Sequence, residues 1–339
     1  MSLDRQICFD FYGFQVAARS RQAERLQDLN IDFSWFRTEG VEADLTIEMR
    51  SFSDRPELPA LPASQHSPRN VVFRNGQTSY LDYSGRALSV SYEDGKRFEL
   101  FCDDRHLTHE IAYLTILSYT GSHLDRRGLI RVHGLGLEVN GKAVLVLLPM
   151  SGGKTTMALS MLQNEGIRLL SEDSPLIRSN GQVLPFPLRI GVRPGTVPPD
   201  VPPDKTLSVE RMEFGPKTLI DISVFHSQLA PECPVGGILL GQRWLAGNAS
   251  ITPLPRRAAL LPFISNAVVG LGLYQGVEFV LEKSVVELLG KSRLAARRLR
   301  ASLAVIRKAQ VYRFAMGPSI DDTAATLLRF LREFSNRPP

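Results

Sequence analysis

A short glycine-containing segment in the middle of the chain carries residues that could bind phosphate groups. It consists of Ser151, Gly152, Gly153, Lys154, Thr155 and Thr156. Glycines let backbone N–H groups come close to an anion, and a lysine supplies positive charge for the outer phosphates. A threonine directly after that lysine can offer its hydroxyl to Mg²⁺. The segment therefore predicts a nucleoside triphosphate site, with ATP and Mg²⁺ as cofactors.

The spacing of this segment matches the phosphate-loop pattern GxxxxGK[ST] at its last three positions. These are Gly153, Lys154 and Thr155, whereas Leu148 stands where the pattern has its first glycine. The interpretation therefore depends on the flanking elements. Residues 143–150 are an apolar run that predicts a buried strand, and residues 155–166 predict a helix that ends at Gly166.

Two acidic residues, Glu172 and Asp173, end the next predicted strand, which begins at residue 167. Carboxylates at a strand end beside a phosphate loop are suited to hold Mg²⁺. The order of strand, loop, helix and strand with terminal acids favours a nucleotide site. The alternative is a glycine turn between a strand and a helix, without a ligand.

Three further residues are candidates for a functional role, which for the two arginines among them is contact with a phosphate or a transition state. His133 lies on the strand before the predicted Asn140-Gly141 hairpin. Arg189 and Arg193 lie four residues apart in a strand-like segment, which places their side chains on the same face. The alternatives are a structural histidine and two solvated arginines.

The rest of the chain supplies a larger frame for this site. Residues 1–102 contain many short strand-like runs and predict a small β-rich N-terminal domain, with one helix over 19–30 and a loop over 51–70. Residues 103–127 predict a connecting helix that begins at Asp103-Asp104, and residues 128–339 predict the catalytic domain. The fold class expected is therefore mixed α/β (α+β).

Composition narrows the classes of protein to which the chain can belong. Apolar residues make up 43% and charged residues 22%, which is typical of a globular chain, and no apolar run has the length of a membrane span. The three cysteines are far apart and form no CxxC pair, so we expect buried thiols in a cytoplasmic protein.

A basic segment over residues 283–310 predicts a long helix with several arginines on one side. Together with the net charge of +5 it raises the question of a nucleic-acid partner. An amphipathic helix with a charged solvent face is the better interpretation, because no interleaved aromatic residues or nucleic-acid motif accompany it.

The segment from Arg131 to Asp173 resembles the nucleotide core of the HPr serine kinase/phosphorylase family. That family has a His-Gly pair on a strand, a glycine hairpin, the phosphate loop and a strand that ends in two acids. His133-Gly134 and Glu172-Asp173 stand in the corresponding places here. The resemblance is closer to the kinases that modify ribosomal peptides such as lasso peptides than to the bifunctional HPr enzymes.

This resemblance implies a fold related to phosphoenolpyruvate carboxykinase and a set of roles. Lys154 and the loop would hold the phosphates, and Thr155 and Asp173 would hold Mg²⁺. Glu172 would accept the proton of the attacking hydroxyl, while His133 and an arginine would steady the phosphoryl group. Self-association would also fit the family.

We therefore expect an ATP-dependent kinase that acts on a serine or threonine hydroxyl of a peptide or protein. Three alternatives remain open. They are a kinase for a small-molecule hydroxyl, a nucleotide-binding regulatory module without transfer activity, and an ATPase linked to nucleic acid.

Overall fold

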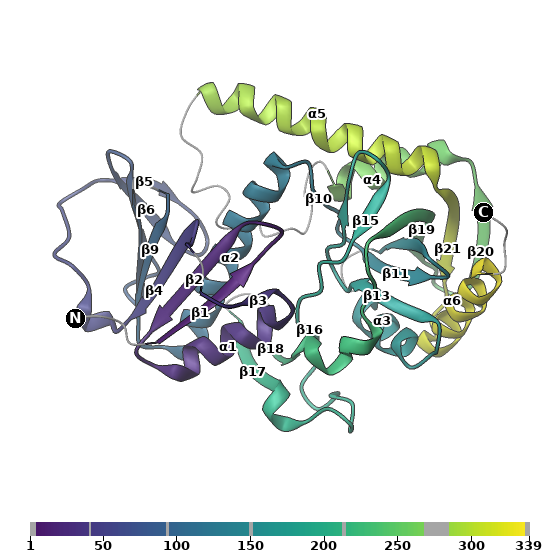
Figure 1. Cartoon of the computed structure of the whole chain (residues 1–339), viewed down its shortest axis with the longest axis horizontal. Helices are drawn as coiled ribbons and strands as arrows, with labels where there is room; N and C mark the ends of the chain where they lie inside the picture. Colours follow the sequence, from purple (N-terminus) through teal and green to yellow (C-terminus); the bar gives the residue numbers. More distant parts are fainter. Residues whose placement is uncertain are drawn as a thin grey trace. The chain divides into compact units, whose positions relative to one another are not determined.

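The computed structural model describes residues 5–40, 42–92, 95–148, 152–211, 215–267 and 285–335 (Figure 1). Helix accounts for 34% and strand for 36% of the chain, which confirms the mixed α/β class. The described residues form two compact units. The first comprises residues 5–123 and 189–224, and the second comprises residues 124–188, 225–267 and 285–335. This division differs from the predicted boundaries at 102 and 127, because the segment 189–224 belongs with the N-terminal strands.

The first unit contains a nine-stranded sheet with the order β3-β1-β2-β4-β9-β8-β7-β6-β5. Alternation of apolar and polar residues explains its central strand β4, in which Leu45, Ile47 and Met49 are buried and their neighbours are not. The predicted loop over 51–70 differs from the structure in two respects, since it includes a short 3₁₀ segment at Phe52–Asp54 and the edge strand β5. The strands are β1 Arg5–Asp10, β2 Gln15–Ser20, β3 Arg37–Thr38, β4 Leu45–Arg50, β5 Ala63–His66, β6 Val71–Asn75, β7 Thr78–Asp82, β8 Ala87–Ser91 and β9 Arg97–Cys102.

Two helices and a second, smaller sheet complete the first unit. Helix α1 (Ala23–Phe33) packs through Ile31 on a three-stranded sheet of β16 (Ile190–Val192), β18 (Gly215–Ile220) and β17 (Thr206–Arg211). Helix α2 (Arg105–Arg126) begins at the predicted place, where Asp104 Oδ1 accepts a hydrogen bond from Leu107 N.

The second unit is built on a sheet with the order β10-β14-β15-β19-β12-β11-β13, to which β21 and β20 are added beside β19. Strands β12, β19 and β21 are parallel neighbours. The predicted hairpin is confirmed, because β11 and β12 are antiparallel and Asn140 and Gly141 both have positive φ, at 48° and 74°. The strands are β10 Ile130–Arg131, β11 Leu135–Val139, β12 Lys142–Leu147, β13 Ile167–Ser171, β14 Leu176–Ile177, β15 Gln182–Leu184, β19 Cys233–Arg243, β20 Ser250–Leu254 and β21 Gln310–Met316.

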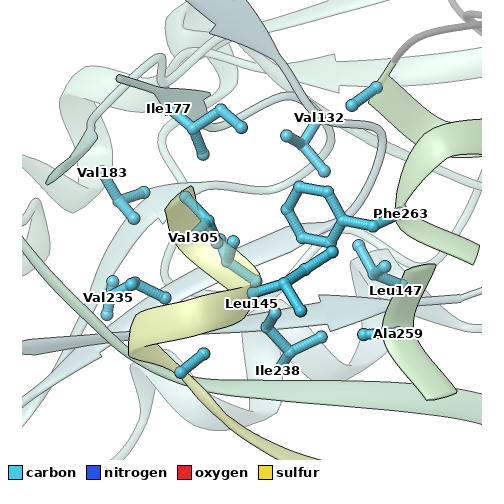
Figure 2. Packing of buried hydrophobic residues seen from close by; sticks show 14 of the residues in the cluster. Val132, Leu145, Leu147, Ile177, Val183, Val235, Ile238, Ala259, Phe263 and Val305 are labelled. Atoms are coloured by element: carbon cyan, nitrogen blue, oxygen red, sulfur yellow. The ribbon is translucent and has the colours of Figure 1, made fainter. Parts of the chain in front are cut away.

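Four helices belong entirely to the second unit: α3 Lys154–Leu162, α4 Leu260–Ala267, α5 Val285–Lys308 and α6 Ile320–Ser335. Helix α3 ends four residues before Gly166, which has φ of 80° in the turn that leads into β13. Figure 2 shows how Phe263 of α4 and Val305 of α5 pack with Leu145 and Ile238 in one buried cluster.

Short 3₁₀ segments connect several of these elements: η1 Ser34–Phe36, η2 Phe52–Asp54, η3 Pro203–Lys205, η4 Ile222–Gln228 and η5 Arg256–Ala259. The three cysteines are buried free thiols, as predicted. Among the helices that the structure describes, none is both long enough and apolar enough to cross a bilayer.

Candidate active site

The glycine-containing segment lies between β12 and α3, as the sequence predicts. Residues 149–151, and with them Ser151, lie outside the described residues. Gly153 adopts the left-handed conformation with φ of 84°, which a residue with a side chain rarely takes. Helix α3 then begins at Lys154, so its first N–H groups lie directly after the glycine turn. Such N–H groups lack partners within the helix and can bind an anion.

The His-Gly pair and the acid pair are brought together by backbone contacts. Gly134 N donates a hydrogen bond to the carbonyl oxygen of Asp173 at 3.0 Å. A Cβ on Gly134 would lie 2.9 Å from a methyl carbon of Leu147 and 3.0 Å from the carbonyl oxygen of Val146. Glycine at this position therefore allows the segment with His133 to lie against the end of β12.

His133, Lys154 and Asp173 form one cluster, which we call the Lys154 cluster. Lys154 Nζ lies 2.5 Å from His133 Nε2 and 3.1 Å from Asp173 Oδ1. An ammonium group can only donate, so His133 Nε2 must accept, and the ring proton of a neutral His133 is then on Nδ1. Nδ1 in turn lies 3.3 Å from Asp173 Oδ1.

The three side chains of the Lys154 cluster differ in their exposure to solvent. The side chains of His133 and Lys154 are each 11% exposed, whereas that of Asp173 is 32% exposed. Burial raises the pKa of Asp173, but the adjacent His133 and the charge on Lys154 outweigh burial and hold this pKa well below its ordinary value. Asp173 is therefore a carboxylate at neutral pH.

Thr155 and Glu172 form a second pair at the same edge of the sheet. Thr155 Oγ1 donates a short hydrogen bond to Glu172 Oε1. The hydroxyl and the carboxylate offer the oxygen atoms that Mg²⁺ prefers. Among the described residues, no group of three or more His, Cys, Asp or Glu side chains could hold a metal ion by itself.

The two predicted arginines belong to the first unit, whereas the Lys154 cluster belongs to the second. Arg189 Nε lies 2.9 Å from Asp32 Oδ1, and its guanidinium carbon lies 3.4 Å from the centre of the Tyr113 ring. Arg193 is exposed, and its carbonyl oxygen accepts a hydrogen bond from Thr196. Thr156, the last predicted phosphate contact, is an exposed residue of α3.

Sequence reasoning missed the residues that hold the acids in place. Ser171 Oγ donates to the carbonyl oxygen of Phe186 at 2.8 Å and accepts from Ser174 N at 3.0 Å, so it fixes the turn that carries Glu172 and Asp173. His133 N donates to the carbonyl oxygen of Asn266 at 3.2 Å. Serines on both sides of the acid pair were a usable signal, whereas nothing near Asn266 in sequence pointed to His133.

Comparison of the sequence with known proteins finds no matching family model and no curated relative. The functional interpretation therefore rests on the residues of the site and their geometry.

Proposed function

We propose that this protein transfers the γ-phosphoryl group of ATP to the hydroxyl of a serine or threonine in a peptide or protein. The observation that carries the proposal is the contact of Lys154 with both His133 and Asp173 at the start of α3. Phosphoryl transfer depends mainly on positioning and on neutralising charge, so a fixed cation beside a glycine turn is its central requirement.

The phosphates would lie over Gly152, Gly153 and the first turn of α3. Backbone N–H groups there can donate to phosphate oxygens, and Lys154 supplies the positive charge. Because Lys154 is held by two partners, its ammonium group does not have to be ordered when the nucleotide binds. This arrangement supports a role in transfer as well as in binding.

Thr155 and Glu172 are the residues best placed to hold Mg²⁺, since their side chains already contact each other. The bound ion would neutralise part of the phosphate charge. This differs from the roles implied by the sequence resemblance, in which Asp173 held the ion and Glu172 accepted the proton. The contacts favour the exchange of the two roles.

Asp173 would then face the acceptor hydroxyl. It is the most exposed member of the Lys154 cluster, and it stays ionised because His133 and Lys154 lower its pKa. An ionised carboxylate can accept a hydrogen bond from the attacking hydroxyl and orient it. His133, whose ring lies beside both Lys154 and Asp173, would keep the carboxylate in position.

Two observations bear on the class of acceptor. In the basic helix α5, Arg297 donates to the carbonyl oxygen of Arg126 at 2.8 Å, and Arg298 pairs with Asp125. Because these arginines have partners within the chain, α5 gives little support for a nucleic-acid substrate. Lys291 and Arg293 lie outside the residues whose side chains are described. The resemblance noted above favours a peptide hydroxyl over a small molecule.

The proposal is tested by incubation of the purified protein with Mg²⁺-ATP and a library of serine- and threonine-containing peptides, followed by mass spectrometry. We expect a gain of one phosphate on a hydroxyl, lost in Lys154→Ala and kept in Lys142→Ala, a matched lysine at the start of β12. ATP hydrolysis that nucleic acid stimulates several-fold, with unmodified peptides, would contradict it.

A regulatory module that binds nucleotide without transfer is the second candidate. Leu148 in place of the first loop glycine favours it, because a side chain there limits how closely the backbone can surround the phosphates. ATP binding without transfer to any hydroxyl-containing compound or to water would support this candidate over the kinase.

A further inference from the structure

The described residues include six large apolar side chains that are exposed. Three of them follow the carboxyl ends of the parallel strands β19 and β21 in the second unit. Trp244 is 51% exposed, Leu245 is 99% exposed and Ile320 is 46% exposed. The other three are Leu58, Leu261 and Leu299. Exposed large apolar side chains that occur together mark a binding surface more often than single ones do.

Parallel strands place these three residues at the same edge as the phosphate segment. β12 leads into the glycine turn, β19 leads into Trp244 and Leu245, and β21 leads towards Ile320 at the start of α6. Ligands of open α/β sheets bind outside the carboxyl ends of the strands. The three side chains are therefore at the end of the sheet where a nucleotide is expected.

Direct contacts join this surface to the start of α3. A Cβ on Gly153 would lie 3.6 Å from Ile320 Cδ1, so Ile320 is a neighbour of the residue that precedes Lys154. Helix α3 also packs beside α6. Ile320, one of the three exposed apolar residues, thus lies beside the proposed phosphate site.

The loop that carries Trp244 is anchored at both ends. Trp244 N donates to the carbonyl oxygen of Met316 at 2.9 Å, and Ala249 N donates to Asp322 Oδ2 at 2.6 Å. A side chain on Gly317 would collide with the carbonyl oxygen of Gly247, so the loop lies tightly against the chain before α6. Trp244 and Leu245 are therefore presented from a fixed backbone.

We propose that Trp244, Leu245 and Ile320 form the binding surface for the nucleobase of the nucleotide. The flat face of a nucleobase can stack on the ring of the exposed Trp244, and aliphatic side chains such as Leu245 can add apolar contact. Stacking of this kind does not depend on hydrogen bonds. The inference rests on the proposed function, since it assumes that the phosphates of the same molecule lie at Lys154.

The test uses the fact that the chain has only two tryptophans, Trp35 and Trp244. In Trp35→Phe the intrinsic fluorescence reports on Trp244 alone, and it is titrated with ATP and with inorganic tripolyphosphate. We expect ATP to quench this fluorescence and to bind at least about fivefold more tightly than tripolyphosphate, the low end for one stacking contact.

Calorimetric titration of variants supplies the second readout. Trp244→Ala and Leu245→Ser should bind ATP and tripolyphosphate with similar affinity, whereas Leu299→Ser, a matched exposed leucine on α5, should keep the preference for ATP.

Equal binding of the two ligands by the parent protein would overturn the inference while leaving the proposed function intact. So would unchanged ATP affinity in Trp244→Ala, or an oligomer that Trp244→Ala dissociates without weakening ATP binding. Failure of both ligands to bind would overturn the proposed function, and the inference with it.

Discussion

Each compact unit contains a carboxylate, a histidine and a cation in contact, but the two groups differ in what surrounds them. In the first unit Asp32 lies 2.7 Å from His109 and 2.9 Å from Arg189; we call this group the Asp32 cluster. Its carboxylate is fully buried and its arginine is covered by the Tyr113 ring. In the Lys154 cluster the carboxylate is 32% exposed and a glycine turn precedes the lysine.

This difference shows that residue types alone do not reveal how a charged group is surrounded. A buried carboxylate that is paired with neighbouring cations stabilises the fold only while all members of the group are present. A carboxylate at an open strand end, beside N–H groups that lack partners, can act on a ligand. The following substitutions test whether the two clusters are divided in this way.

Lys154→Ala is expected to have the largest effect. Loss of a cation that stabilises the transferring phosphoryl group lowers turnover by about 10³–10⁵-fold in comparable enzymes. The substitution also removes the ion pair with Asp173, so the melting temperature should fall as well and the rate is compared per folded molecule. Steady-state kinetics and a thermal melt measure the two effects. A rate per folded molecule like that of the parent would show that Lys154 is not functional.

Substitutions of the two acids should differ in how the reaction rate depends on the Mg²⁺ concentration. Glu172→Gln removes a charged oxygen ligand, so it should raise the Mg²⁺ concentration needed for half-maximal rate. Asp173→Asn should lower kcat by about 10²–10⁴-fold at saturating Mg²⁺. Rates measured over a Mg²⁺ titration distinguish the variants. The reverse pattern would restore the roles that the sequence resemblance implied.

Asp32→Asn should act on stability instead of rate. It leaves the partly buried Arg189 without the buried carboxylate of Asp32, and breaking a buried pair costs up to about 3–5 kcal/mol. Arg189→Ala should also lower stability while the rate per folded molecule stays unchanged. Denaturant unfolding with Asp200→Asn as the exposed control measures this. A normal unfolding free energy with a reduced rate would place the Asp32 cluster in the active site.

The pH dependence of stability provides a smaller, more specific test of the Lys154 cluster. The pKa of Asp173 is lower in the folded chain than its ordinary value of about 3.9, so its contribution to stability is present above that pH. The contribution is lost as the pH falls through the folded-state pKa. The difference in melting temperature between parent and Asp173→Asn should therefore be constant from pH 7 to about pH 5 and shrink below about pH 4. A difference that does not change with pH would mean that His133 and Lys154 do not lower the pKa of Asp173.

Arg193→Ala should change least. The side chain is exposed, and such substitutions usually alter stability by less than about 0.5 kcal/mol. We expect both the unfolding free energy and the rate to be close to those of the parent. A rate reduced more than about tenfold would identify Arg193 as a phosphate contact after all.

Local signals in the sequence predicted much of the second unit. The hairpin at Asn140-Gly141 and the helix that follows the glycine turn, predicted from residue 155 and observed from Lys154, each depend on a few adjacent residues. Their outcome is therefore determined by turn and capping chemistry that can be read along the chain.

The contacts between distant segments could not be predicted in the same way. The spacing of Arg189 and Arg193 indicated a shared face, but their partners depend on how residues 189–224 pack on α1. The contacts of Glu172 with Thr155 and of Asp173 with Lys154 also depend on tertiary structure, since adjacent residues at a strand end point in different directions. Sequence supplied the candidates, and packing assigned their neighbours.

Segments of the two units alternate along the chain, so the gene cannot be divided between the units at a single point. The first unit takes its small sheet from residues 189–224, which are encoded between two segments of the second unit. A fragment that ends near residue 127 therefore lacks the surface on which Ile31 packs. Neither unit corresponds to one uninterrupted stretch of coding sequence. Recombination at a single point therefore cannot transfer the unit that contains the Lys154 cluster to another protein without dividing one of the two units.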